Sequence, residues 1–168
     1  MVIFFLRLKI LPSISVPKVK QGLARTFWSG RIQILNDGKI FNIRNNITIV
    51  DGSHNQDGAI VLDHYLSKQS FGKWNLIIGM LNNREVIDFV KIFKNHINKI
   101  YAIAIPELKN SLSAQEIKNK LDGLGFHTDT SNSLENALKI ADNKTPLLIT
   151  GSLYLAGYAL KFNETIID

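Results

Sequence analysis

Cysteine is absent from the 168 residues, which excludes a disulfide framework, a cysteine-ligated zinc site and a cysteine nucleophile. The sequence also contains no run of about 20 apolar residues, the length that spans a bilayer. The nearest candidate is residues 1–6, but Arg7 and Lys9 follow this run, whereas a signal peptide carries its charges before the apolar segment. These absences predict a cytoplasmic protein with no membrane partner.

Several motifs are missing as well. The sequence has no G-x-x-x-x-G-K-[ST] phosphate loop, no G-x-S-x-G elbow and no G-x-G-x-x-G fingerprint. No two of its four histidines have metal-ligand spacing such as H-x-x-x-H, so we predict no metal site on this chain.

The formal net charge is +6, but the pattern of charge argues against a nucleic-acid partner. The 20 basic residues are scattered singly along the chain rather than clustered among aromatic residues. Isoleucine and asparagine are also abundant, so a compositional bias towards Ile, Asn and Lys explains the charge more simply. A hydrophobic fraction of 45% with 20% charged residues is typical of one folded globular domain.

Two kinds of segment alternate from about residue 32 onwards. Short β-branched or apolar runs occupy residues 31–35, 39–43, 47–50, 74–78, 99–103 and 146–150, with a further short strand possible at 126–128. Stretches with helical periodicity lie near residues 56–69, 84–95, 113–123, 133–143 and 152–162. This alternation predicts an α/β fold, Rossmann-like, with a mostly parallel sheet flanked by helices.

The start of the chain reads differently. The first two runs are separated by Asn36-Asp37-Gly38, a turn signal, so we expect the sheet to open with a β-hairpin. Before it, Pro12 and Pro17 interrupt the chain, and residues 16–23 could form one short helix. We expect this N-terminal stretch to lie outside the sheet.

Three junctions between a strand and a helix carry Gly and small polar residues. They are residues 51–55, 79–83 and 151–154. Ligands of open parallel sheets bind beyond the carboxyl ends of the strands, where loops lead into helix N-termini. Each junction taken alone could equally be a turn, a loop or a helix cap, but the sheet should bring all three to one edge.

His54 is the histidine most suggestive of function, because it lies in the first junction, three residues after Asp51. An Asp at a strand end can accept hydrogen bonds from ribose hydroxyls or orient a histidine. His64, His96 and His127 fall in or beside helices or at an edge, where we expect structural or solvated roles.

Four segments resemble motifs of one enzyme family, in the same order. Residues 22–31 read GLARTFWSGR, similar to G-L-A-x-T-x-W-P-G-R, and residues 51–58 read DGSHNQDG, similar to D-G-A-H-N-P-D-G. Residues 79–85 (GMLNNRE) match G-M-L-x-x-K/R-D/E, and residues 151–155 match G-S-L-Y-L. The chain therefore resembles the C-terminal domain of folylpolyglutamate and dihydrofolate synthases, members of the Mur ligase superfamily.

The resemblance implies an ATP-dependent carboxylate–amine ligase. Such enzymes activate the carboxylate of a folate or of dihydropteroate as an acyl phosphate, which the amine of L-glutamate attacks to form an amide. ATP and Mg²⁺ would be the cofactors, and the Mg²⁺ ligands are expected on an N-terminal P-loop ATPase domain. The resemblance does not distinguish folate from dihydropteroate as the acceptor.

By position, the resemblance assigns four residues of this chain. Arg31 and Asp51 match residues that contact ATP, with Asp51 at the ribose. His54 and Ser152 match positions near the incoming glutamate. No residue is given a certain catalytic role. Ser29, Ser53 and Gln56 depart mildly from the family pattern.

The largest departure is that no ATPase domain is present in the sequence. We expect residues 1–22 to correspond to the end of that domain and a hinge, and residues 23–168 to form the ligase-type C-terminal domain. The chain alone should then be inactive, and a separate ATPase-domain chain is a possible partner. The alternative is a remnant of a split gene that binds a nucleotide or a partner without catalysing ligation.

Overall fold

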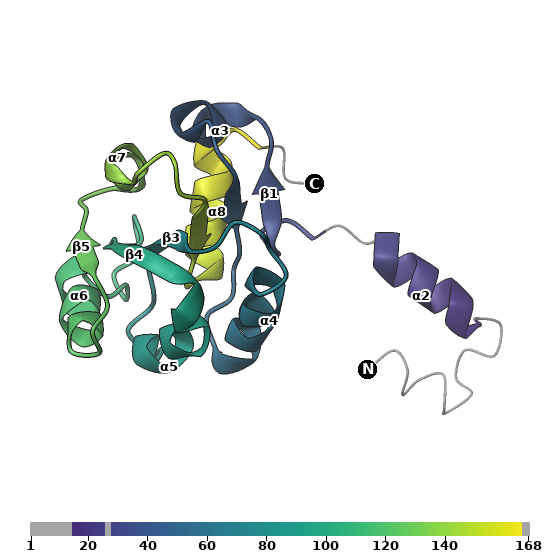
Figure 1. Ribbon diagram of the computed structural model, residues 1–168, viewed down its shortest axis with the longest axis horizontal. Helices are drawn as coiled ribbons and strands as arrows, with labels where there is room; N and C mark the ends of the chain where they lie inside the picture. Colours follow the sequence, from purple (N-terminus) through teal and green to yellow (C-terminus); the bar gives the residue numbers. More distant parts are fainter. Residues whose placement is uncertain (1–14, 26–27, 166–168) are drawn as a thin grey trace.

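A computed structural model describes residues 15–25 and 28–165 (Figure 1). In this part of the chain six strands form one sheet, in the order β1-β2-β6-β3-β4-β5. β1 is antiparallel to β2, and the other neighbours are all parallel. The strands are β1 Gln33–Leu35, β2 Thr48–Val50, β3 Trp74–Ile78, β4 Ile97–Ala102, β5 Thr128–Thr130 and β6 Leu147–Thr150.

Helices connect the parallel strands, as the alternating pattern predicts. They are α2 Val16–Arg25, α3 Gly38–Arg44, α4 Gln56–Leu66, α5 Val86–Val90, α6 Ala114–Asp122, α7 Leu134–Ile140 and α8 Leu153–Phe162, with a 3₁₀ segment η1 at Lys91–His96. The predicted mostly parallel α/β sheet flanked by helices is confirmed. The short helix expected near residues 16–23 is α2, which stands apart from the α/β body in Figure 1.

The predicted β-hairpin is wrong. β1 and β2 do pair antiparallel, but residues 39–43 form helix α3 instead of a strand. The β-branched run concealed a helical spacing, because Ile40 and Arg44 lie one turn apart and are both buried. Asn163, from the far end of the chain, accepts a hydrogen bond from Ile40 N at 2.7 Å. That contact stabilises the first turn of α3, and nothing in the neighbouring sequence predicts it.

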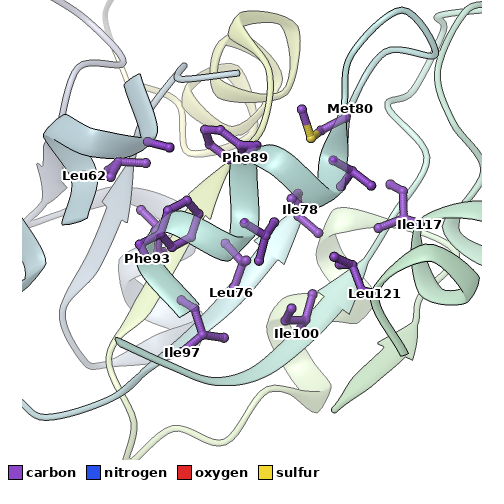
Figure 2. Close-up of a cluster of buried hydrophobic side chains, with 14 of the residues drawn as sticks. Leu62, Leu76, Ile78, Met80, Phe89, Phe93, Ile97, Ile100, Ile117 and Leu121 are labelled. Atoms are coloured by element: carbon purple, nitrogen blue, oxygen red, sulfur yellow. The ribbon is translucent and has the colours of Figure 1, made fainter. Parts of the chain in front are cut away.

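Helices cover both faces of the sheet. On one face, α4, α5 and α6 bury a cluster around Leu76 and Ile78, part of which Figure 2 shows. On the other face, α3, α7 and α8 pack over Ile77. All five residues of β3 are therefore buried, as expected of a central parallel strand. Each fully buried aliphatic side chain contributes about 1.5–3 kcal/mol of transfer free energy.

Smaller differences lie at the element ends. The strand expected at residues 126–128 forms two residues later, as β5.

No helix in the described ranges is both long and apolar enough to cross a membrane.

Candidate functional site

The three predicted junctions meet at one edge of the sheet. They follow β2, β6 and β3, which are neighbours in the strand order. Backbone hydrogen bonds join them: Gly151 N donates to Ser53 O at 3.1 Å, and Gly79 N donates to Thr150 O at 3.4 Å. The expectation that the sheet brings these loops together is confirmed.

Gly151 is the residue that allows the loops to approach so closely. Its φ is +109°, and a Cβ there would lie 2.9 Å from the carbonyl oxygen of Gly79 and from side-chain atoms of Ile78 and Met80. Any other residue would push the two loops apart and strain the backbone.

A small cavity of about 110 Å³ lies between the loops, lined by His54, Leu81, Arg84, Gly151, Ser152, Leu153 and Tyr154. Sites for drug-sized ligands usually measure about 300–1,000 Å³. The cavity is therefore too small for a whole nucleotide and suits a small group.

His54 reaches the cavity in a defined orientation. Its Nδ1 lies 3.0 Å from the carbonyl oxygen of Gly52, an acceptor, so Nδ1 carries the proton in the neutral ring. Nε2 is then the ring nitrogen that can accept a proton or a hydrogen bond.

Arg84 lies beside His54, and the sequence analysis gave it no role. The two residues also line a neighbouring hollow of about 230 Å³, together with Asn55, Gln56, Asn83, Glu85, Asp88 and Phe89. The basic position of the motif at residues 79–85 was the signal that could have singled it out. A guanidinium here supplies a planar fork of donors suited to a carboxylate or a phosphate.

Ser152 is the helix cap that the sequence allowed, and its contact with glutamate stays a prediction. It is buried, and its Oγ accepts a hydrogen bond from Tyr154 N at 3.1 Å, which caps the N-terminus of α8. It also lines the cavity.

Asp51 lies within the loop rather than in the cavity. Its side chain is 2% exposed, and its two oxygens accept from backbone donors, Oδ1 from Ser53 N and Oδ2 from Ile32 N, both at 2.8 Å. The carboxylate is thus already well satisfied by this chain, and its contact with ATP stays a prediction.

Arg31 is exposed on the turn that precedes β1, and it does not line the cavity. Among the described residues, its guanidinium has no hydrogen-bond or ion-pair partner, so its charge is free to meet an anion from outside. Its contact with ATP is also a prediction.

The other histidines lie away from this edge. His96 pairs with Asp63 at 3.1 Å, and His64 and His127 are exposed. Across the described ranges, no group of three or more His, Asp or Glu residues is arranged to hold a metal ion.

A mostly parallel sheet with three glycine-containing loops meeting at its carboxyl edge is the arrangement of a Rossmann-like ligand-binding domain. Comparison with known proteins identifies the family to which this domain belongs. Residues 39–162 match the family described as dihydrofolate synthetase, C-terminal domain, and the chain belongs to that family.

Relatives agree with this assignment. The chain is 26% identical over 160 residues to a probable dihydrofolate synthetase of Schizosaccharomyces pombe, covering 86% of this chain and 36% of that protein. It is 25% identical over 141 residues to a folylpolyglutamate synthase of Lacticaseibacillus casei, covering 82% of this chain and 30% of that protein. The chain thus spans about a third of the length of these relatives.

Solved structures share the fold. The folylpolyglutamate synthase of Mycobacterium tuberculosis complexed with ADP superposes with a TM-score of 0.75 at 17% identity, covering 93% of this chain and 37% of that one. FolC of E. coli in complex with DHPP and ADP gives a TM-score of 0.71 at 19% identity, covering 89% and 34%.

Proposed function

We propose that this chain is the glutamate-ligase domain of a folylpolyglutamate or dihydrofolate synthase and supplies one half of an ATP-dependent amide-forming site. ATP would transfer its γ-phosphoryl group to a folate or dihydropteroate carboxylate, giving an acyl phosphate and ADP. Attack by the amine of L-glutamate would then form the amide and release phosphate and a proton. The observation that carries this proposal is the convergence of His54, Arg84 and Ser152 on one small cavity, from three loops that bear the family motifs.

Three polar side chains at the cavity could bind the charged groups of glutamate. Arg84 can bind a glutamate carboxylate through two parallel hydrogen bonds. Ser152 Oγ adds a hydroxyl at the same wall. His54 Nε2 is the acceptor that would orient the ammonium group or take its proton before attack.

This chain would supply only part of the ATP site. The exposed guanidinium of Arg31 can offset phosphate charge, and Asp51 is proposed to meet the ribose when the nucleotide is bound. Because the sequence has no P-loop, a P-loop ATPase domain would hold the phosphates and Mg²⁺. Mg²⁺ there would neutralise charge on the transferred phosphoryl group.

The test is complementation between separate domains. This chain is mixed with a separately expressed ATPase domain of the family, and phosphate release is followed with ATP, glutamate and either dihydropteroate or a folate. We expect release above the sum of the two parts alone. The acceptor that gives the faster rate identifies the substrate.

Arg84→Ala and Ser152→Ala should raise the KM for glutamate at least about tenfold, since each removes a hydrogen bond to a charged group worth about 1.5–3 kcal/mol. Lys91→Ala, at an exposed residue outside the cavity, is the matched control. No turnover with any acceptor, from a folded chain that still binds nucleotide, would favour the non-catalytic module instead.

A further inference from the structure

The turn that carries Arg31 has an unusual backbone. Ile32 has a φ of +45°, and Gly30, two residues earlier, has a φ of +71°. Glycine adopts this left-handed region freely, whereas a β-branched residue is rarely found there because its side chain crowds the backbone. Something other than local preference must hold Ile32 in place.

The loop after β2 holds the turn on both sides of Arg31. Ile32 N donates to Asp51 Oδ2 at 2.8 Å, and Gly52 N donates to Gly30 O at 2.7 Å. The residues that flank Arg31 are therefore bound to two consecutive residues of the first junction. Within the turn, Gly30 N also donates to the side chain of Gln33 at 2.8 Å.

Asp51 is the charged member of this arrangement. Asp51 is only 2% exposed, and its carboxylate accepts one N–H from Ile32, 19 residues earlier, and one from Ser53, two residues later. Hydrogen bonds to an ionised acceptor are stronger than neutral ones. A buried carboxylate that lost them would be poorly solvated, so the turn and the loop each require the other.

We infer that Asp51 is a positioning residue: its carboxylate fixes the Arg31 turn in its left-handed conformation and so sets where the Arg31 guanidinium stands at the carboxyl edge of the sheet. The role of Arg31 towards ATP rests on the function proposed above. We call the two hydrogen bonds from Ile32 N to Asp51 Oδ2 and from Gly52 N to Gly30 O the clamp. The clamp does not rest on the proposed function, and it can be measured in the chain alone.

Amide hydrogen exchange of the full chain tests the clamp. Asp51→Ala should speed exchange at the Ile32 amide about tenfold or more, because this part-buried amide loses its charged acceptor. Exchange in β3 should not change. Asp142→Ala is the matched control, since Asp142 anchors a different loop through Lys144 N and the hydroxyl of Thr145. It should leave Ile32 unaffected.

Unchanged Ile32 exchange in Asp51→Ala would overturn the inference. If this variant does not fold, Asp51→Asn serves instead. An NH₂ group then replaces one of the two acceptor oxygens and faces an N–H donor, so faster exchange is expected at Ile32 or Ser53. Unchanged exchange at both would overturn the inference.

The complemented enzyme tests how Asp51 acts. If Asp51 acts through Arg31, the effects of Asp51→Ala and Arg31→Ala on the KM for ATP should combine in the double variant to less than their product, even when Asp51 also meets the ribose. Two effects that multiply fully would overturn the positioning role. Absence of turnover in the unmodified pair would instead count against the proposed function, and the exchange result would still decide the clamp.

Discussion

Arg44 shows how a single residue can organise a region remote from the proposed site. Its side chain is fully buried, and its guanidinium donates to the carbonyl oxygens of Ala141, Asp142 and Thr145 and to Asn143 Oδ1. Burial lowers the pKa of Arg44, and nearby Asp142 and Tyr101 oppose that shift. The group stays charged, because an arginine is not deprotonated in proteins.

Arg44→Ala should therefore reduce the free energy of unfolding by about 3–5 kcal/mol, since it leaves several buried carbonyl groups without a donor. Urea denaturation measures the change. Arg31→Ala, at an exposed arginine, should change stability by no more than about 0.5 kcal/mol. Equal losses for the two variants would contradict a structural role for Arg44.

At the scale of elements, helix α3 depends on a residue distant in sequence. Its N-cap residue, Asp37, makes no side-chain cap. Asn163, which follows α8 and is 1% exposed, accepts from Ile40 N and donates to Asp37 O instead. α8 thus supplies the cap that α3 lacks.

Asn163→Ala should cost about 2 kcal/mol of stability, because it leaves buried backbone groups at the start of α3 unsatisfied. Asp37→Ala, at the position where a cap would ordinarily be sought, should cost only a few tenths of a kcal/mol. Thermal or urea denaturation of both variants decides the matter. A larger loss for Asp37→Ala would show that α3 is capped locally after all.

Edge strand β5 is joined to β4 by an ion pair. Lys99 Nζ lies 2.6 Å from Asp129 Oδ2. The hydrogen bond to Lys99 lowers the pKa of Asp129, and the same bond raises the pKa of Lys99. Both side chains are partly exposed to solvent, 28% for Lys99 and 45% for Asp129, so we expect the pair to contribute about 0.2–1 kcal/mol.

The sign of the pH dependence follows from the two shifts. The contribution of Asp129 is present above its unfolded pKa and is lost as pH falls through its lowered folded pKa. That of Lys99 is present below its unfolded pKa and is lost as pH rises through its raised folded pKa. Asp129→Asn should slightly reduce the loss of unfolding free energy at both the acid and the alkaline end of the range, measured by urea unfolding between pH 2 and 11. An unaltered pH profile would show that the pair contributes nothing.

At the scale of the whole molecule, the sheet couples two cores. Phe93 belongs to the cluster under α4, α5 and α6, while Ile77 faces the opposite cluster. Both clusters share the strands between them, so a defect on one face should weaken the entire domain rather than one layer.

Phe93→Ala should lower the free energy of unfolding by about 3–5 kcal/mol through lost burial and a residual cavity. Trp74 is fully buried, whereas Trp28 is 71% exposed. In a Trp28→Phe background, Trp74 fluorescence therefore reports the core alone. Its transition should coincide with that of circular dichroism, and two separated transitions would show that the layers unfold independently.

Much of this fold was predictable from the sequence because its signals are local. Apolar runs such as residues 76–78 must lie in strands buried on both faces, and one-sided apolar spacing marks the helices that cover them. Once parallel strands alternate with helices, their carboxyl ends share one edge. The meeting of the three junctions therefore followed from topology.

Contacts between distant segments decided the rest. Residues 39–43 form a helix because Ile40 is buried and its amide is bound by a residue 123 positions away. Asp51 serves a strained turn 19 residues earlier, and Arg84 stands beside His54 across two loops. Periodicity and motif order determined the class of fold and the residues that gather at its edge. Only packing and hydrogen bonding between segments remote in sequence decided which of them face the cavity and which hold the loops in place.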